Sequence, residues 1–140
     1  YSEELYLSSM RPLMEELGRW NEDQRKAAFR RSYVAADTQI ITCDDSRIGW
    51  LQITERDTDF NLSQIQIHQD FCGYGIGSAI IGALLARAGA AGKTVSLSAV
   101  RINRAIGLYE RLGFRKVNPD ASPILEMVWE PGQQQRSGRE

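Results

Sequence analysis

Three glycines at alternate positions, Gly73, Gly75 and Gly77, are the residues of this sequence whose spacing most clearly suggests chemistry. Glycine has no Cβ and tolerates a positive φ, so successive amides can point into one concavity where a helix starts. Such a concavity holds unpaired N–H groups and the positive end of a helix dipole, which suit a phosphate or pyrophosphate. On the glycines alone, a plain glycine-rich turn is an equally good interpretation.

The segments that flank the glycines are predicted to be a strand and a helix. Residues 64–67 alternate polar and apolar side chains, which is the period of a half-buried strand. After the glycines, apolar residues recur at helical spacing, namely Ile76, Ala79, Ile80, Ala83, Leu84 and Ala88. The glycines therefore lie where the chain turns from strand to helix.

Two familiar phosphate-binding loops do not fit this segment. A Walker loop ends in Gly-Lys-Ser/Thr, and no lysine occurs between Lys26 and Lys93. A dinucleotide-binding fingerprint needs a further glycine near Ile80 and an acidic residue about 20 positions on. Residues 95–98 read Val-Ser-Leu-Ser, without a carboxylate.

Two sequence blocks resemble the GNAT superfamily of N-acetyltransferases. Residues 72–77, Cys-Gly-Tyr-Gly-Ile-Gly, resemble its acetyl-CoA signature Gln/Arg-x-x-Gly-x-Gly/Ala, with cysteine at the first position. Residues 103–114, Asn-Arg-Ala-Ile-Gly-Leu-Tyr-Glu-Arg-Leu-Gly-Phe, resemble its more specific Asn-x-x-Ala-x-x-x-Tyr-x-x-x-Gly-Phe block. The two blocks occur in the family's order and at its spacing, and the resemblance extends over most of residues 48–118. The chain is therefore identified as a member of this superfamily.

The predicted fold class is α/β, with an α+β mixed sheet. The patterns indicate a helix ending near Gly18, a helix from the Asn21–Gln24 capping box to about Arg31, strands 38–43, 47–55 and 60–67, helix 76–91, strand 94–100, a helix from Asn103 to Gly113, and strands 114–118 and 124–129. Strand 94–100 should run parallel to 60–67 by the right-handed crossover rule. This order matches the GNAT fold, a mostly antiparallel sheet with one splayed parallel pair, without the family's first strand.

Length and composition indicate one domain over residues 1–130 and a disordered tail over 131–140. The net charge of −1 does not suggest nucleic-acid binding, and no apolar run approaches the ~20 residues of a membrane span. Cys43 and Cys72 do not form a disulfide framework, and no second histidine supports a metal site beside His68. We expect a cytoplasmic protein, a monomer or homodimer, with no metal, membrane or nucleic-acid partner.

The resemblance implies a cofactor site for acetyl-CoA as co-substrate. Backbone groups of Ile65 and Ile67 would bond the pantetheine arm like an added strand. The implied pyrophosphate contacts are Cys72, Gly73, Tyr74, Gly75, Ile76, Gly77 and Ser78. Cysteine at position 72 removes the charged contact that arginine would make, and a covalent acyl-cysteine is the less favoured interpretation of this residue.

Tyr109 is predicted to point inward from its helix, together with Ile106 and Leu112. From the helix alone, a core tyrosine is the simpler interpretation. The resemblance implies that Tyr109 lies by the thioester sulfur and protonates the leaving thiolate, and we adopt that role. Asn103 is expected to cap the helix first and to contact the cofactor second.

A base must accept the proton of the acceptor amine. If the turn is centred on Thr58, Glu55 faces Asn61, which occupies the place of a glutamate base in some family members and cannot serve as one. Glu55 continues an apolar strand face, so its pKa would be raised and it could act as the base. A solvated strand-end glutamate is an equally good interpretation. His68 is expected to have a hydrogen-bonded structural role rather than a role in proton relay.

The predicted function is direct transfer of an acetyl group from acetyl-CoA to a primary amine, either on a small molecule or on a protein. One alternative is a regulatory module that binds CoA without turnover. A second is a nucleotide-binding regulator that uses the glycine loop for another phosphate ligand.

Overall fold

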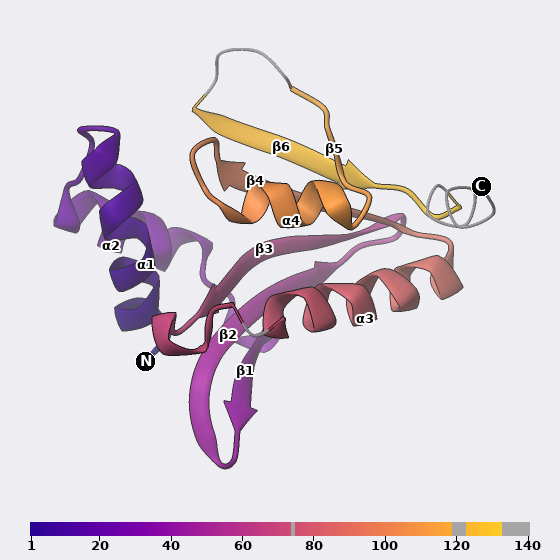
Figure 1. The fold of residues 1–140 in the computed structure, drawn as a ribbon, viewed down its shortest axis with the longest axis horizontal. Helices are drawn as coiled ribbons and strands as arrows, with labels where there is room; N and C mark the ends of the chain where they lie inside the picture. The colour runs from indigo at the N-terminus through magenta and orange to yellow at the C-terminus, as the bar shows by residue number, and fades with distance from the viewer. Residues whose placement is uncertain (74, 119–122, 133–140) are drawn as a thin grey trace. The chain divides into compact units, whose positions relative to one another are not determined.

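The structure is a computed structural model that describes residues 1–73, 75–118 and 123–132 (Figure 1). Its elements are α1 (Ser2–Glu16), α2 (Glu22–Ser32), η1 (Ala35–Asp37), β1 (Thr38–Cys43), β2 (Ser46–Glu55), β3 (Asp59–Ile67), η2 (Gln69–Phe71), α3 (Ile76–Ala91), β4 (Thr94–Val100), α4 (Ala105–Arg111), β5 (Arg115–Lys116) and β6 (Ile124–Trp129). The predicted order of helices and strands is confirmed. Tyr74 and residues 119–122 and 133–140 lie outside the described part of the chain, and with them most of the tail predicted to be disordered.

The strands form a six-stranded sheet in the order β1-β2-β3-β4-β6-β5. Strands β3 and β4 run parallel, whereas β1–β2, β4–β6 and β5–β6 are antiparallel pairs. The predicted class, a mixed and mostly antiparallel sheet with one parallel pair, is therefore confirmed. By its internal contacts the chain divides into a first unit (Tyr1–Gln52 and Gln64–Cys72) and a second unit (Ile53–Ser63 and Gly73–Glu140). The single domain over residues 1–130 stays a prediction.

The core of the first unit is a cluster of aromatic and aliphatic side chains. Leu5 and Tyr6 from α1, Phe29 from α2 and Trp50 from β2 are buried together. The Phe29 ring lies 5.3 Å from that of Tyr6 and 6.0 Å, edge to face, from that of Trp50, which are favourable aromatic geometries. The predicted N-cap of α2 is confirmed, since the Gln24 amide donates to Asn21 Oδ1 at 3.0 Å.

A buried polar side chain, Gln52, joins α2 to the sheet of the first unit. Its Oε1 accepts from the Val34 amide, and its Nε2 donates to the Ser32 carbonyl, both at 2.9 Å. Gln52 is only 2% exposed, and a buried amide without partners would be costly. These bonds fix the segment that follows α2 against β2.

The core of the second unit lies between its helices and the β4–β6 pair. Val95 and Leu97 of β4 stand opposite Trp129 and Met127 of β6, and all four are buried. A Cβ at Gly89 of α3 would lie 3.7 Å from the Trp129 ring, and one at Gly113, just after α4, would lie 3.1 Å from it. Both helices therefore approach the same buried tryptophan on one face of this pair (Figure 1).

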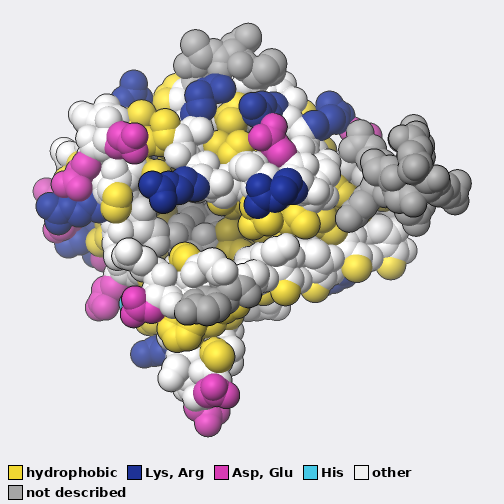
Figure 2. Space-filling model, in the orientation of Figure 1, with side chains coloured by type: hydrophobic (Ala, Val, Ile, Leu, Met, Phe, Trp, Pro, Cys, Tyr) yellow, Lys and Arg dark blue, Asp and Glu magenta, His cyan; other side chains and the backbone are white. Residues whose placement is uncertain are grey.

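The core-facing side of α3 differs from the row of apolar residues noted in the sequence. The buried residues are Ile81, Leu84, Leu85 and Ala88, whereas Ala79 and Ala83 are exposed. Figure 2 shows the apolar side chains that remain on the outer side of this helix. A helix that is apolar on most sides has no unique periodic face, so tertiary packing decided its rotation.

Strand β5 is shorter than the predicted strand 114–118. The Val117 amide still donates to the Glu126 carbonyl at 2.9 Å. At Asn118 the side chain, rather than the backbone, bonds to β6. Its Oδ1 accepts from the Glu126 amide, and its Nδ2 donates to the Ile124 carbonyl at 3.0 Å. An asparagine side chain that mimics the backbone in this way ends the ladder.

Candidate functional site

The loop before α3 adopts the conformation that its glycines allow. Gly73 has a φ of 87° and Gly75, the N-cap of α3, a φ of 78°. A Cβ at either position would meet no atom within 4 Å. These two positions therefore require glycine for backbone conformation, and the space beside them is open. Ile76, Gly77 and Ser78 form the first turn of α3, and Tyr74 lies outside the described residues.

The first turn of α3 offers uncompensated positive charge. The helix has 16 residues, its N-cap makes no side-chain hydrogen bond, and its first turn contains no acidic residue. The first amides of a helix have no intrahelical acceptor, and the helix dipole adds partial positive charge there. Chemically, this end of the second unit can receive an anion such as a phosphate.

Cys72 and His68 belong to a compact turn of the first unit. The exposed Cys72 Sγ lies 3.7 Å from the carbonyl oxygens of Ile67 and His68. His68 Nδ1 accepts from the Asp70 amide at 3.2 Å and lies 3.6 Å from Asp70 Oδ2. His68 thus has the hydrogen-bonded, local role that was expected of it.

Strand β3 and strand β4 pair over only part of their lengths. Their register runs from Asp59↔Thr94 to Leu62↔Leu97, whereas β3 extends to Ile67 and β4 to Val100. Ile65 and Ile67, the two predicted pantetheine contacts, lie on β3 past the paired stretch and are half-buried.

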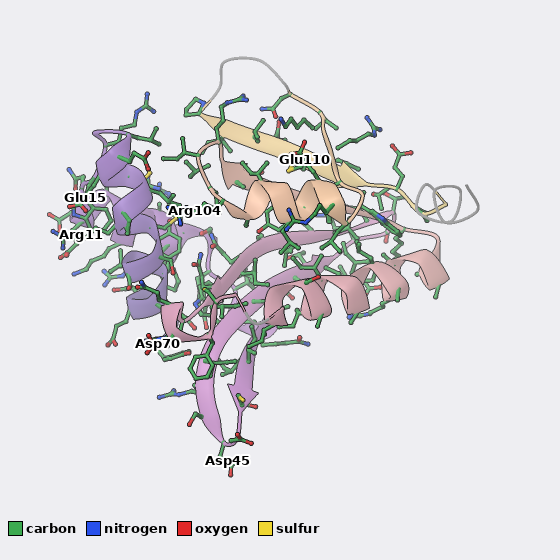
Figure 3. The ribbon with its side chains drawn as sticks, viewed as in Figure 1. Arg11, Glu15, Asp45, Asp70, Arg104 and Glu110 are labelled. Carbon is green, nitrogen blue, oxygen red and sulfur yellow. The ribbon has the colours of Figure 1, made fainter. Side chains whose placement is uncertain are left out.

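The second sequence block, residues 103–114, forms α4 and its flanks. Asn103 Oδ1 accepts from the Ala105 amide at 2.9 Å, so its side chain caps the first turn as predicted. Tyr109 is buried, with its ring 5.9 Å from that of Phe114, and burial raises the pKa of its phenol. Arg104 and Glu110, labelled in Figure 3 near the two ends of α4, are exposed. The predicted inward direction of Tyr109 is confirmed.

Glu55 does not have the environment that was predicted for a base. The Arg56 amide donates to the Asp59 carbonyl at 2.8 Å, which sets Glu55 opposite Phe60 rather than Asn61. Glu55 accepts from Lys93 Nζ at 2.8 Å and from Arg87 at 3.3 Å. The hydrogen bond and charge of Lys93, with the charge of Arg87, lower the pKa of Glu55, so the predicted rise in pKa is wrong.

Asn61 belongs instead to a polar network that sequence reasoning missed. Its Nδ2 donates to Ser96 Oγ at 3.0 Å, and Ser96 Oγ donates to Asp59 Oδ2 at 2.8 Å. The alternate polar residues of β3 and β4 could have indicated this network. Paired parallel strands present such alternate positions on the same face of the sheet. The contact joins residues 35 positions apart, so neither segment alone indicates it.

Among the described residues, no group of three or more metal-ligating side chains could hold an ion. No helix in the described part of the chain is long and apolar enough to cross a membrane.

Comparison with known families identifies the chain's class. The profile of the acetyltransferase (GNAT) domain family matches residues 28–116, and the chain belongs to this family. A search of curated proteins finds no match. The family assignment made from the glycine loop and the 103–114 block is confirmed.

Solved structures show the same fold at low sequence identity. The PaiA N-acetyltransferase of Thermoplasma acidophilum, in complex with coenzyme A, is 14% identical, with a TM-score of 0.71 and coverage of 92% of this chain and 87% of that one. The ribosomal-protein-S18-alanine N-acetyltransferase of Escherichia coli is 20% identical, with a TM-score of 0.60 and coverage of 80% and 77%. A GNAT family acetyltransferase of Elizabethkingia anophelis with acetyl-CoA bound is 15% identical, with a TM-score of 0.55 and coverage of 66% and 74%.

Proposed function

We propose that this protein is an N-acetyltransferase that transfers the acetyl group of acetyl-CoA directly to a primary amine. The observation that carries the proposal is the loop before α3, where Gly73 and Gly75 have positive φ and open space beside them. The family match and two structural neighbours that hold CoA or acetyl-CoA support the choice of cofactor.

The proposed cofactor contacts are those that the family resemblance implies. The backbone groups of Ile65 and Ile67 would bond the pantetheine arm. The pyrophosphate would contact Cys72, Gly73, Tyr74, Gly75, Ile76, Gly77 and Ser78, and the remainder of the cofactor would contact Asn103 and Tyr109. The chemistry is mainly positioning, because an oriented amine and thioester need little further activation.

The proposed reaction begins with attack of a neutral amine on the thioester carbonyl. The C–N bond forms, the C–S bond breaks, and the thiolate takes a proton from the Tyr109 hydroxyl. The proton released by the amine returns to the phenolate through water, so the products are an amide and CoA thiol. Burial favours the protonated phenol, which keeps Tyr109 available as a donor at neutral pH.

Glu55 remains an untested candidate for the base, but its contacts weaken the case. A carboxylate whose pKa is lowered by Lys93 is a poor proton acceptor. For this reason we propose that water accepts the amine proton. The same observation favours the second candidate function, a module that binds CoA without turnover.

A two-stage experiment tests the proposal. CoA should raise the melting temperature of the protein, and ATP at the same concentration should not. Acetyl-CoA should then release thiol in the presence of an amine panel of small amines, amino acids, antibiotics and peptides with a free N-terminal alanine, the last suggested by one neighbour's substrate. Binding without thiol release from any amine would favour the regulatory module, and stabilisation by ATP alone would favour a nucleotide-binding regulator.

We further propose that the protein acts in the cytoplasm as a monomer or homodimer, without a metal or nucleic-acid partner. The two free and exposed thiols, Cys43 and Cys72, suit a reducing compartment.

A further inference from the structure

The chain between the ends of the β2–β3 hairpin is longer on the β3 side than on the β2 side. Near the turn, the Arg56 amide donates to the Asp59 carbonyl, and at the far end the His68 amide donates to the Ile48 carbonyl at 2.7 Å. In a regular antiparallel ladder, residues joined by such bonds lie opposite each other. From Ile48 to Arg56 the chain advances eight residues, and from Asp59 to His68 it advances nine. The extra residue identifies a β-bulge on the β3 side.

Gly49 is the residue that faces this bulge. Counting from the turn places Gln66 opposite Gly49, and counting back from His68 places Ile67 opposite it. A Cβ at Gly49 would overlap the Gln66 carbonyl oxygen and lie 3.1 Å from the Ile67 Cα. The residue count shows that β3 has one extra residue between these two bonds. The close approach at Gly49 places that residue at Gln66–Ile67.

Position 49 requires glycine because a Cβ would not fit there, and not because of its backbone angles. Gly49 is not among the glycines with positive φ, so alanine could adopt its backbone angles. The obstacles to a Cβ are backbone atoms, which cannot rotate away as a flexible side chain can. Gly49 is also buried and pairs with Ile41 at the point where the β1–β2 register shifts. The site has little freedom to accommodate a methyl group.

We propose that Gly49 is a positioning residue for the CoA-binding segment of β3. Its missing side chain admits the bulged Gln66–Ile67 peptide, and the bulge bends the strand and turns its neighbouring peptide groups out of the regular ladder. The orientation of the backbone at Ile65 and Ile67, the proposed pantetheine contacts, then depends on a residue that does not touch the cofactor. This inference rests on the proposed function.

The test compares two glycine-to-alanine variants in the full chain. Gly49→Ala should weaken CoA binding by about tenfold or more, the scale of a small misplacement of binding groups. Gly82→Ala is the matched control, because a Cβ there meets nothing within 4 Å, and its CoA affinity should equal that of the wild type. Calorimetric titration with CoA gives the affinities, and amide NMR shifts at Ile67 and His68 report the bulge without any ligand.

Deletion of Gln66 tests the bulge even if Gly49→Ala fails to fold. Removing one residue lets β3 pair with β2 in one continuous register, so the deletion variant should fold and lose CoA affinity. Gln66→Ala, which keeps the residue count, separates loss of the side chain from loss of the bulge.

The outcomes distinguish this inference from the proposed function. If the wild type binds no CoA, the proposed function fails. If the wild type binds CoA and either folded Gly49→Ala or the deletion variant binds it equally well, the positioning role of Gly49 is wrong and the proposed function stands.

Discussion

Two parts of the second unit carry concentrated charge, and they are built in opposite ways. The loop before α3 is made of backbone amides around Gly73 and Gly75, with open space beside both glycines. The Glu55 cluster is made of side chains: Glu55 bonds Lys93 and Arg87, and both cations also lie over the Phe60 ring, at 5.1 and 4.8 Å.

The loop amides are free to bind a ligand, whereas the side chains of the Glu55 cluster already bind one another. In the cluster, each charge faces a partner of opposite sign and Phe60 covers the cations. These are the features of a structural contact. At the loop, the amides at the helix start await an acceptor. We therefore propose that the loop binds the ligand and that the cluster contributes to stability, and the following predictions test that division.

The largest expected effect is that of Gly75→Asp on CoA binding. An aspartate at the N-cap would introduce a negative charge where the pyrophosphate is proposed to lie, and a side chain at a φ of 78°. CoA binding should become undetectable by titration calorimetry, although aspartate is a good capping residue. Gly18→Asp, at another helix end with positive φ and open space, controls for strain. Unchanged CoA affinity in a folded Gly75→Asp protein would refute the site.

Tyr109→Phe should lower kcat by about 10²-fold and leave the affinity for acetyl-CoA nearly unchanged, as expected for loss of a general acid. Tyr109 is the one buried titratable side chain with a proposed catalytic role. This variant therefore tests whether a side chain contributes to catalysis beyond the positioning provided by backbone groups. Because burial raises the pKa of Tyr109, wild-type kcat should show no loss from its ionisation up to about pH 9. Equal turnover of both proteins at every pH would make Tyr109 structural.

Cys72→Arg should tighten CoA by roughly 0.5–1 kcal/mol, the scale of an exposed charge pair. The gain should shrink as salt screens the interaction. Cys72→Ser should retain turnover, because the proposed transfer is direct. A Ser variant with normal CoA affinity and no activity would require a covalent acyl-cysteine instead.

The smallest effect on activity is expected for Glu55→Gln. The hydrogen bond and charge of Lys93 lower the pKa of Glu55 from its ordinary value. The contribution of Glu55 to stability is therefore complete above the unfolded-state pKa and is lost as pH falls through the folded-state pKa. Wild type should melt higher than the variant at pH 7, and the two should converge in acid. Thiol release should be nearly equal, and a large loss of kcat would restore Glu55 as the base.

Sequence reasoning succeeded where a single segment determines its own structure. The bounds of β1, α3, β4 and β6 and the caps at Asn21 and Gly113 were predicted correctly, since each depends on local periodicity or capping chemistry. The two sequence blocks also led to correct predictions of the glycine turn before α3 and of the inward direction of Tyr109.

The errors arose where two segments must be aligned with each other. A shift of one residue in the β2–β3 turn moved Glu55 from Asn61 to Phe60, because each step in register exchanges the two faces of a strand. The bulge opposite Gly49 shifts the pairing register of β2 and β3 by one more residue, and no pattern in residues 46–67 predicts it. The Asn61–Ser96 bond likewise depends on how β3 and β4 meet.

The environment of Lys93 has a consequence for self-modification. The chain has 14 arginines and only three lysines, Lys26, Lys93 and Lys116, so it presents few lysine amines to the proposed acetyl-CoA co-substrate. Lys93 is held by Glu55 and the Arg56 carbonyl and its side chain is 17% exposed, whereas that of Lys116 is 40% exposed. Prolonged incubation with acetyl-CoA should therefore label Lys26 and Lys116 before Lys93, so peptide mass mapping of autoacetylation can follow the integrity of the Glu55 cluster without an identified acceptor.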